Sequence, residues 1–130
     1  MKKPAVLIIA ASERDANLYY ATRFIAPDPF VFLQIAGEKI LLMSDLEVDR
    51  ARSQSSADRV LSTSKLAADY RKRKKERPSL IDLIEDFLKS KRTRNLLVPG
   101  DFPVSYADAL RKRGFHLTSK PDPFFEKRTV

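Results

Sequence analysis

The chain has 130 residues, which suits one domain with a core of its own. It carries 25 Lys and Arg against 17 Asp and Glu, for a net charge of +8, and its 43% hydrophobic content indicates a globular protein. It has no Cys, which excludes disulfides, thiolate nucleophiles and Cys-ligated metals, and which suits a reducing, cytoplasmic compartment.

The first 29 residues are predicted to hold one strand and a turn-rich connection. Residues 5–11 are an unbroken apolar run, which indicates a central strand. The run is too short, and too closely followed by charged residues, to cross a membrane. Residues 12–17 are polar and suit the start of a short helical turn. The aromatic residues 18–24 fit a strand or a turn, and Pro27 and Pro29 break the chain after them.

A hairpin followed by a helix is predicted next. Residues 30–35 and 39–44 are nearly all apolar, which favours strands that are buried on both faces. Gly37 between them supplies the positive φ that a tight turn requires. Ser44 and Glu47 match a capping box that would begin a helix.

Strands and helices alternate through the second half of the chain. The predicted elements are a strand at 59–62, a helix at 64–75 stopped by Pro78, a helix from 80 capped by Ser79, a strand at 96–98, a helix opened by a box of Ser105 and Asp108, and a strand at 115–118 after Gly114. A turn follows at 121–124. This order predicts an α/β fold class: a mixed five- to six-stranded sheet with helices on both faces, in one domain spanning 1–130.

No catalytic or metal motif is recognisable. With only three glycines, the chain cannot form a phosphate-cradling loop of the Gly-rich type. His116, the one histidine, alternates with apolar neighbours as an ordinary strand residue would, and no Ser lies in a Gly-x-Ser-x-Gly elbow. The acidic residues come mostly at predicted helix starts, where capping explains them. We therefore predict no catalytic residue and no metal ligand in this chain.

A basic run at residues 71–77 holds six Lys or Arg and one Glu, so it supplies +5 of the net +8. Its candidate anion-contacting residues are Arg71, Lys72, Arg73, Lys74 and Lys75. Binding of phosphates there would weaken with salt, but beyond Tyr70 no aromatic residue is interleaved for base stacking. We favour a solvated helix end whose cations face the negative pole of the helix dipole. A stand-alone nucleic-acid-binding module that uses residues 71–77 remains the alternative function.

A polar and aromatic patch precedes the double-proline break. It consists of Asn17, Tyr19, Tyr20 and Arg23. From the residues alone, a strand whose aromatic side chains fill the edge of the core is favoured over a loop that faces a ligand or a partner.

In their order along the chain, several segments resemble the amino-terminal domain of the creatinase, prolidase and aminopeptidase P family. The family's Asn-x-x-Tyr-x-Thr-Gly-Phe segment corresponds to residues 17–24, with Arg23 where the family has Gly. The apolar first strand, the hairpin at 30–43, the acidic helix start at 44–51 and residues 97–103 and 123–128 match further landmarks. The resemblance covers essentially the whole chain.

The resemblance implies a creatinase amino-terminal-domain-like fold and a non-catalytic role. In the family, hydrolysis of Xaa-Pro peptides belongs to a following "pita-bread" domain, where two Asp, one His and two Glu hold two divalent metals (Mn, Co or Zn). The resemblance thus implies no cofactor in this chain, a carboxy-terminal catalytic domain outside it as partner, a peptide substrate through that parent, and a homodimer. The implied substrate- or dimer-adjacent loop spans residues 23–29, with the candidate residues Asn17, Tyr20, Arg23, Phe24 and Asp28.

Overall fold

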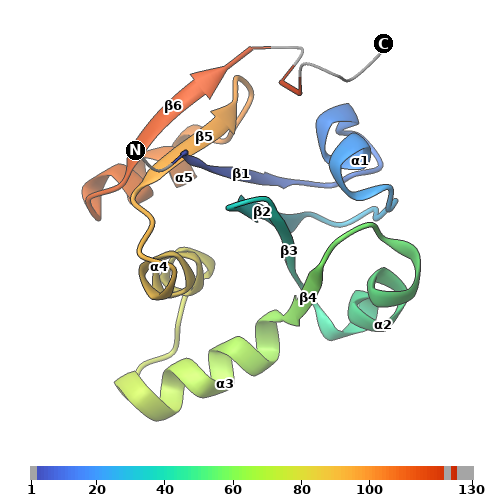
Figure 1. The fold of residues 1–130 in the computed structure, drawn as a ribbon. Coiled ribbons are helices and arrows are strands. Elements are labelled where there is room, and N and C mark those ends of the chain that lie inside the picture. Colours follow the sequence, from blue (N-terminus) through green and yellow to red (C-terminus); the bar gives the residue numbers. More distant parts are fainter. Residues whose placement is uncertain (1–2, 122–123, 126–130) are drawn as a thin grey trace.

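In the computed structural model, which describes residues 3–121, 124 and 125, six strands form one mixed sheet in the order β4-β3-β2-β1-β5-β6 (Figure 1). The strands are β1 (Ala5–Ala10), β2 (Phe30–Ile35), β3 (Glu38–Met43), β4 (Arg59–Ser62), β5 (Asn95–Pro99) and β6 (His116–Lys120). β2 runs antiparallel to β1 and β3, and the other neighbouring pairs are parallel. The predicted mixed sheet is confirmed, because one hairpin lies among parallel crossovers.

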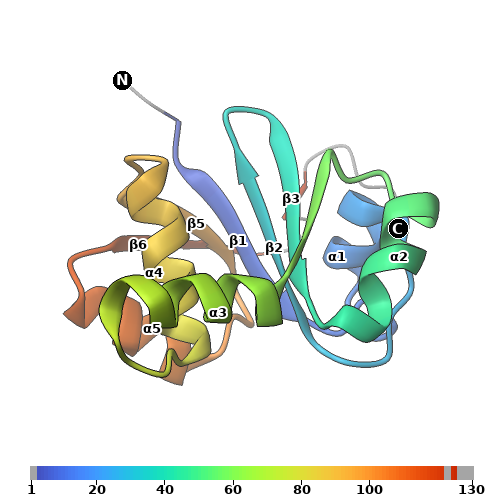
Figure 2. The same cartoon turned by 90° about the horizontal axis from the view of Figure 1, so that it is seen from below.

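Five helices in the described part of the chain cover the two faces of this sheet. They are α1 (Ala16–Thr22), α2 (Asp45–Gln54), α3 (Thr63–Lys74), α4 (Leu80–Ser90) and α5 (Val104–Lys112). Figure 2 shows α1 and α2 on one side of the sheet and α3, α4 and α5 on the other. The prediction of helices on both faces is confirmed.

The central strands bury both of their faces, as their unbroken apolar sequences predicted. Side chains alternate along a strand, so Phe32 packs with α1 and α2, while its neighbour Leu33 packs with α4 and α5. Both are 0% exposed. Leu18 of α1 and Ile84 of α4 close the two cores from outside. The sheet is therefore the shared wall of two hydrophobic cores.

The hairpin turn between β2 and β3 needs two residues with positive φ. Gly37 has φ 85°, as predicted, and Ala36 has φ 52°. Two successive residues with positive φ give the turn a twist that matches the twist of the flanking strands. Gly37 adopts this conformation freely, whereas Ala36 is a side-chain-bearing residue in a conformation that favours Gly or Asn.

Helix α4 begins at the Ser79 cap that its sequence predicted, and Asp82 completes a capping box with it. The Ser79 hydroxyl accepts from the Asp82 N–H at 3.1 Å, and the Asp82 carboxylate accepts from the Ser79 N–H at 2.8 Å. Arg113, just after α5, donates to the same carboxylate at 2.6 Å. These contacts, the Ser79 N–H first and Arg113 second, lower the pKa of Asp82. One carboxylate therefore both begins α4 and joins it to the end of α5.

The structure corrects the prediction for residues 18–24. A strand or a turn was expected there, but the residues up to Thr22 belong to helix α1. The Asp15 carboxylate accepts from the Leu18 N–H at 2.9 Å and caps the helix. Leu18 and Ala21, three residues apart, both face the core. A helix of only two turns, with one face toward the core, has too short a periodic pattern to outweigh the strand propensity of its tyrosines.

Two predicted helix starts are also wrong in detail. Ser44 precedes α2 but makes no side-chain cap, because the Glu47 carboxylate binds Arg50 instead of closing a box. Helix α5 begins at Val104 after Pro103, without a side-chain cap, so Ser105 lies inside the helix. In both places the sequence pattern fits a cap, but neither side-chain bond forms.

Two further predictions lie partly outside the described residues. These are the turn at 121–124, of which Asp122 and Pro123 are not described, and the landmark at 123–128, of which only Phe124 and Phe125 are. Phe124 is buried in the core beneath α1 and α2, and its ring contacts that of Phe125.

We expect Asp82→Asn to lower the free energy of unfolding by about 1 kcal/mol at neutral pH, since it removes one half of a capping box and weakens the Arg113 contact. The pKa of Asp82 is lower in the folded chain than in the unfolded chain. Its carboxylate therefore stabilises the fold above about pH 4, and this stabilisation is lost as the pH falls below that value toward the lowered pKa. Urea unfolding at pH 7 and at a series of lower pH values checks this: the difference from the unmodified chain should shrink as the pH falls below about 4. Asp108→Asn, at an exposed position on α5, is the control. An equal loss in both variants would contradict the prediction.

Candidate functional site

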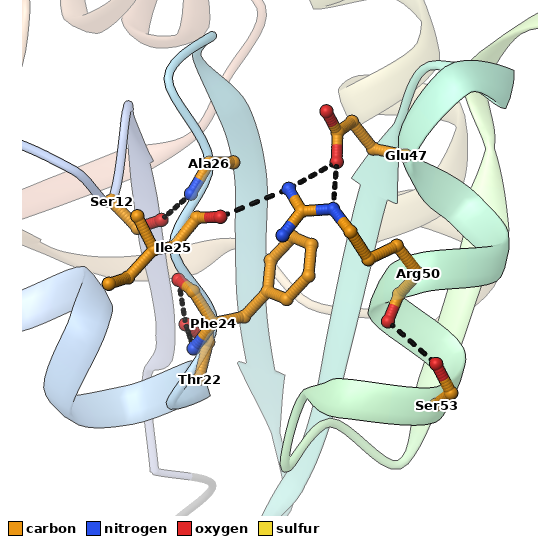
Figure 3. A network of polar contacts seen from close by, with 8 residues as sticks. All are labelled: Ser12, Thr22, Phe24, Ile25, Ala26, Glu47, Arg50 and Ser53. Atoms are coloured by element: carbon orange, nitrogen blue, oxygen red, sulfur yellow. Dashed lines mark hydrogen bonds and ion pairs between the residues drawn. The ribbon is translucent and has the colours of Figure 1, made fainter.

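The 23–29 loop, which joins α1 to β2, is fixed to the protein at both of its sides. The hydroxyl of Ser12 accepts from the Ala26 N–H at 2.8 Å, and the Ala26 carbonyl accepts from the Glu13 N–H at 3.2 Å. From the opposite side, Arg50 of α2 donates to the Ile25 carbonyl at 3.0 Å. The loop thus spans the distance between the end of β1 and α2 on a fixed path (Figure 3).

Arg50 is the centre of this network. Its guanidinium donates to the Glu47 carboxylate at 2.5 and 3.0 Å, and its Cζ lies 4.2 Å from the centroid of the Phe24 ring. Phe24 itself is 1% exposed. Thr22 secures its backbone, because its hydroxyl accepts from the Phe24 N–H at 3.2 Å and donates to the Leu18 carbonyl at 2.8 Å. Arg50 therefore covers a core aromatic ring and holds the loop backbone at the same time (Figure 3).

The five residues proposed for this loop do not form one site. Asn17 and Phe24 are buried, and Phe24 is a core residue. Tyr20 is half-buried and stacks with Phe125 at 5.4 Å between ring centroids. Arg23 is exposed, with its Cζ 5.2 Å from the Tyr20 ring centroid. Asp28 is exposed further along the loop. Of the five, Tyr20 and Arg23 contact each other directly.

Arg23 ends α1 in a left-handed conformation, with φ 53° and ψ 29°. Its N–H donates to the Tyr19 carbonyl at 2.7 Å, which is a helix-ending bond of the kind that Gly commonly supplies. Arg23 therefore holds a backbone conformation that Gly would adopt without strain. The guanidinium also lies over the rings of Tyr19 and Tyr20, which offsets part of the cost of the backbone conformation.

The carboxyl edge of the sheet exposes several apolar side chains. Ile25 is 55% exposed beside the end of β1, Leu46 is 92% exposed in the first turn after β3, and Val104 is 72% exposed where α5 begins after β5. All three follow or adjoin the ends of strands that run in the same direction, so they share one edge of the sheet. Sequence reasoning singled out none of them, because the sequence pattern does not show which apolar residues stay exposed after folding.

The basic run at 71–77 is divided by its contacts. Arg73 is held by Asp86 of α4 at 2.7 and 3.2 Å and by Asp69 at 2.9 Å, and these carboxylates raise its pKa. Lys72, Lys74 and Lys75 are exposed. Arg73 thus links α3 to α4 through its carboxylate partners.

A pocket of about 600 Å³ lies at the carboxyl edge of the sheet, between the strands and α3, α4 and α5. Its apolar wall includes Ile9, Val31, Leu42, Leu80, Leu83 and Tyr106. Its charged lining consists of Arg71 and Arg77. Sequence reasoning missed this pocket because its walls come from six different elements.

Residues 3–121, 124 and 125 lack both a cluster of candidate metal ligands and a helix that could span a membrane. In that part of the chain, no group of three or more His, Cys, Asp or Glu residues is placed to hold a metal ion. His116 is exposed on β6, as expected for an ordinary strand residue. None of the helices there is both long and apolar enough to span a membrane.

Solved structures with the same fold are Xaa-Pro peptidases. The X-Pro aminopeptidase from Thermotoga maritima MSB8 matches with a TM-score of 0.70 and 11% identity, over 90% of this chain and 30% of that one. An Xaa-Pro aminopeptidase from Streptococcus pyogenes matches with a TM-score of 0.63 and 17% identity, over 95% of this chain and 81% of that one. The prolidase from Pyrococcus horikoshii OT3 matches with a TM-score of 0.60 and 18% identity, over 92% of this chain and 28% of that one.

These matches concern the fold. The matching part is the N-terminal region of these proteins, so the expected resemblance to that domain is confirmed. The chain spans about 30% of the length of the longer structures and about 80% of the shorter ones. No family model and no curated protein matches the sequence.

We expect Arg23→Gly to be more stable than Arg23→Ala by about 1 kcal/mol, because both remove the guanidinium but only Gly adopts a positive φ without strain. Thermal or urea unfolding of the two variants gives the difference directly. The matched control is the same pair at Lys72, an exposed position inside α3, where Ala should be the more stable by a similar amount. If Ala were the more stable residue at both positions, the left-handed conformation of Arg23 would be contradicted.

Proposed function

We propose that this chain is the non-catalytic amino-terminal domain of a metal-dependent Xaa-Pro dipeptidase or aminopeptidase. The observation that carries the proposal is the likeness of fold: 90 to 95% of this chain superposes on part of three Xaa-Pro peptidases. In this proposal the hydrolase chemistry, with its two divalent metals (Mn, Co or Zn), belongs to a carboxy-terminal catalytic domain. The described residues of this chain supply no metal cluster of their own.

The role proposed for this domain is to support dimerisation and to shape the entrance of the active site. The 23–29 loop suits such a role because it is held by Ser12 on one side and by Arg50 on the other. A loop fixed in this way can present Ile25 to a partner without an entropic cost of ordering. Leu46 and Val104 extend the apolar contact along the same edge of the sheet.

The loop also carries the groups that would approach a peptide. Arg23 is exposed and oriented by two tyrosine rings, so its position is defined although its side chain is long. A guanidinium can bind a peptide carboxylate in a bidentate manner. We assign Arg23, with Tyr20 behind it, as the substrate-adjacent pair of the loop, and the cytoplasm as the location of the parent enzyme.

The first test is the activity of the purified chain. We expect residues 1–130 alone to leave an Ala-Pro dipeptide uncut, with or without added Mn²⁺ or Co²⁺, because hydrolysis requires the metals of the catalytic domain. A prolidase assayed in parallel shows that the conditions support cleavage. Metal-dependent cleavage by the pure chain, abolished by EDTA, would refute a non-catalytic role.

The second test uses the protein as it is made in its own cells, recovered with an antibody to this chain. We expect a product longer than 130 residues that cleaves Xaa-Pro peptides and loses this activity with EDTA. A product of 130 residues without associated peptidase activity would falsify the proposal.

In the same full-length product, Ile25→Asp should weaken the dimer at least tenfold, because an unpaired carboxylate would be buried in an apolar contact. Light scattering over a dilution series measures this. Thr118→Asp, at an exposed position on β6, is the matched control and should leave the dimer unchanged. An unaffected dimer in Ile25→Asp would remove the 23–29 loop from the interface.

A further inference from the structure

The pocket at the carboxyl edge lies where the chain leaves the sheet in two directions. After β3 the chain enters α2 on one face, and after β4 it enters α3 on the other face (Figure 2). In open α/β sheets, a crevice forms outside the strand ends where successive connections diverge in this way. The pocket adjoins the 23–29 loop only at Pro29, so it is a separate feature from the proposed contact edge.

Most of the residues that line the pocket are apolar, and serines, a threonine and two arginines supply its polar part. Strand residues such as Ile9, Val31 and Leu42 form the floor, and Leu80 and Leu83 of α4 form a wall. Its volume of about 600 Å³ is within the range of pockets that enclose small organic molecules. A small inorganic anion would leave this apolar surface in contact with water, so the lining favours a ligand with an apolar body.

The charged residues that line the pocket are all positive. Arg71 on α3 and Arg77 in the connection to α4 line it, and no Asp, Glu or Lys does. Within the described residues neither arginine has an ion pair, in contrast to Arg73 and Arg113, which are held by carboxylates. Two guanidinium groups at the rim of an apolar pocket, without a counter-charge, favour an anionic head group on its ligand.

The Asp45 carboxylate, which follows the lining residue Ser44 in the chain, is already engaged. Asp45, in the first turn of α2, accepts from the hydroxyls of Ser62 and Ser64, and these bonds lower its pKa. It does not line the pocket. The hydroxyls of Ser44 and Tyr106, which do line it, have no hydrogen-bond partner among the described residues. The pocket therefore offers donors to an anion and has no carboxylate of its own to repel it.

The first turns of α2, α3 and α4 also open at this pocket, where Ser44, Thr63 and Ser79 are part of the lining. The N–H groups of a first helical turn carry partial positive charge, which adds to the field of the two arginines. This contribution has the same sign as the arginines and does not alter the ligand class that they select.

We propose that this pocket binds a small-molecule carboxylate with an apolar, aliphatic body, with Arg71 and Arg77 on the carboxylate and the sheet floor against the aliphatic chain. This binding function goes beyond the proposed role as a peptidase domain and does not rest on it. It assigns an intrinsic ligand site to the face of the sheet opposite α1 and α2.

Calorimetric titration of the full chain with octanoate tests the proposal. We expect saturable binding of one octanoate, about tenfold weaker binding of hexanoate because two methylenes are lost, and no comparable binding of the uncharged octanamide. Inorganic phosphate should not displace octanoate at similar concentrations. Equal binding of octanoate and octanamide would overturn the assignment of an apolar carboxylate. Displacement of bound octanoate by inorganic phosphate at a similar concentration would overturn it as well.

Variants then place the site. Arg71→Gln and Arg77→Gln should each weaken octanoate binding about tenfold or more, whereas Lys72→Gln, which removes an exposed charge from the same helix, should not. Ala67→Phe, which fills the pocket from α3, should abolish binding while circular dichroism and the melting temperature show a folded chain. Equal loss in Arg71→Gln and Lys72→Gln, or full binding by folded Ala67→Phe, would place octanoate elsewhere and refute the proposal.

Discussion

The double-sided burial of β1, β2 and β3 is the constraint on which the rest of this structure depends. Each of these strands has apolar side chains on both faces, so neither face can be left in water without a large free-energy cost. Helices α1 and α2 must cover one face, and α3 to α5 the other. The long connection from β4 to β5 follows from this requirement, because it carries α3 and α4 across the sheet to the uncovered face.

That arrangement leaves the carboxyl edge of the sheet as the place where function can be located. The connections diverge there, the pocket opens there, and Ile25, Leu46 and Val104 are exposed there. The 23–29 loop reaches the same edge, and Arg50 fixes it by joining α2, the loop backbone and the ring of Phe24. Arg50, together with Ser12 on the other side, thus makes this loop an ordered part of the surface.

The distribution of charge separates structural cations from available ones. Arg50, Arg73 and Arg113 each bind carboxylates and join elements that are distant in sequence. Arg71 and Arg77 belong to the same basic run as Arg73, yet they line the pocket without a carboxylate. The basic run, which looks uniform in sequence, therefore has two roles. The net charge of +8 overstates the positive charge that an anionic partner would meet.

The sequence by itself determined the sheet, the hairpin with Gly37, the Ser79 cap of α4 and the resemblance to Xaa-Pro peptidase N-terminal domains. These features depend on local pattern and on the order of segments, which a single chain displays directly. It misassigned residues 18–22 and the caps at Ser44 and Ser105, where short range and competing partners weaken the local pattern. Only the tertiary structure decided the network of Arg50 and the pocket beside Arg71. Those features join residues from several elements, and their contacts exist only once the two faces of the sheet have been covered.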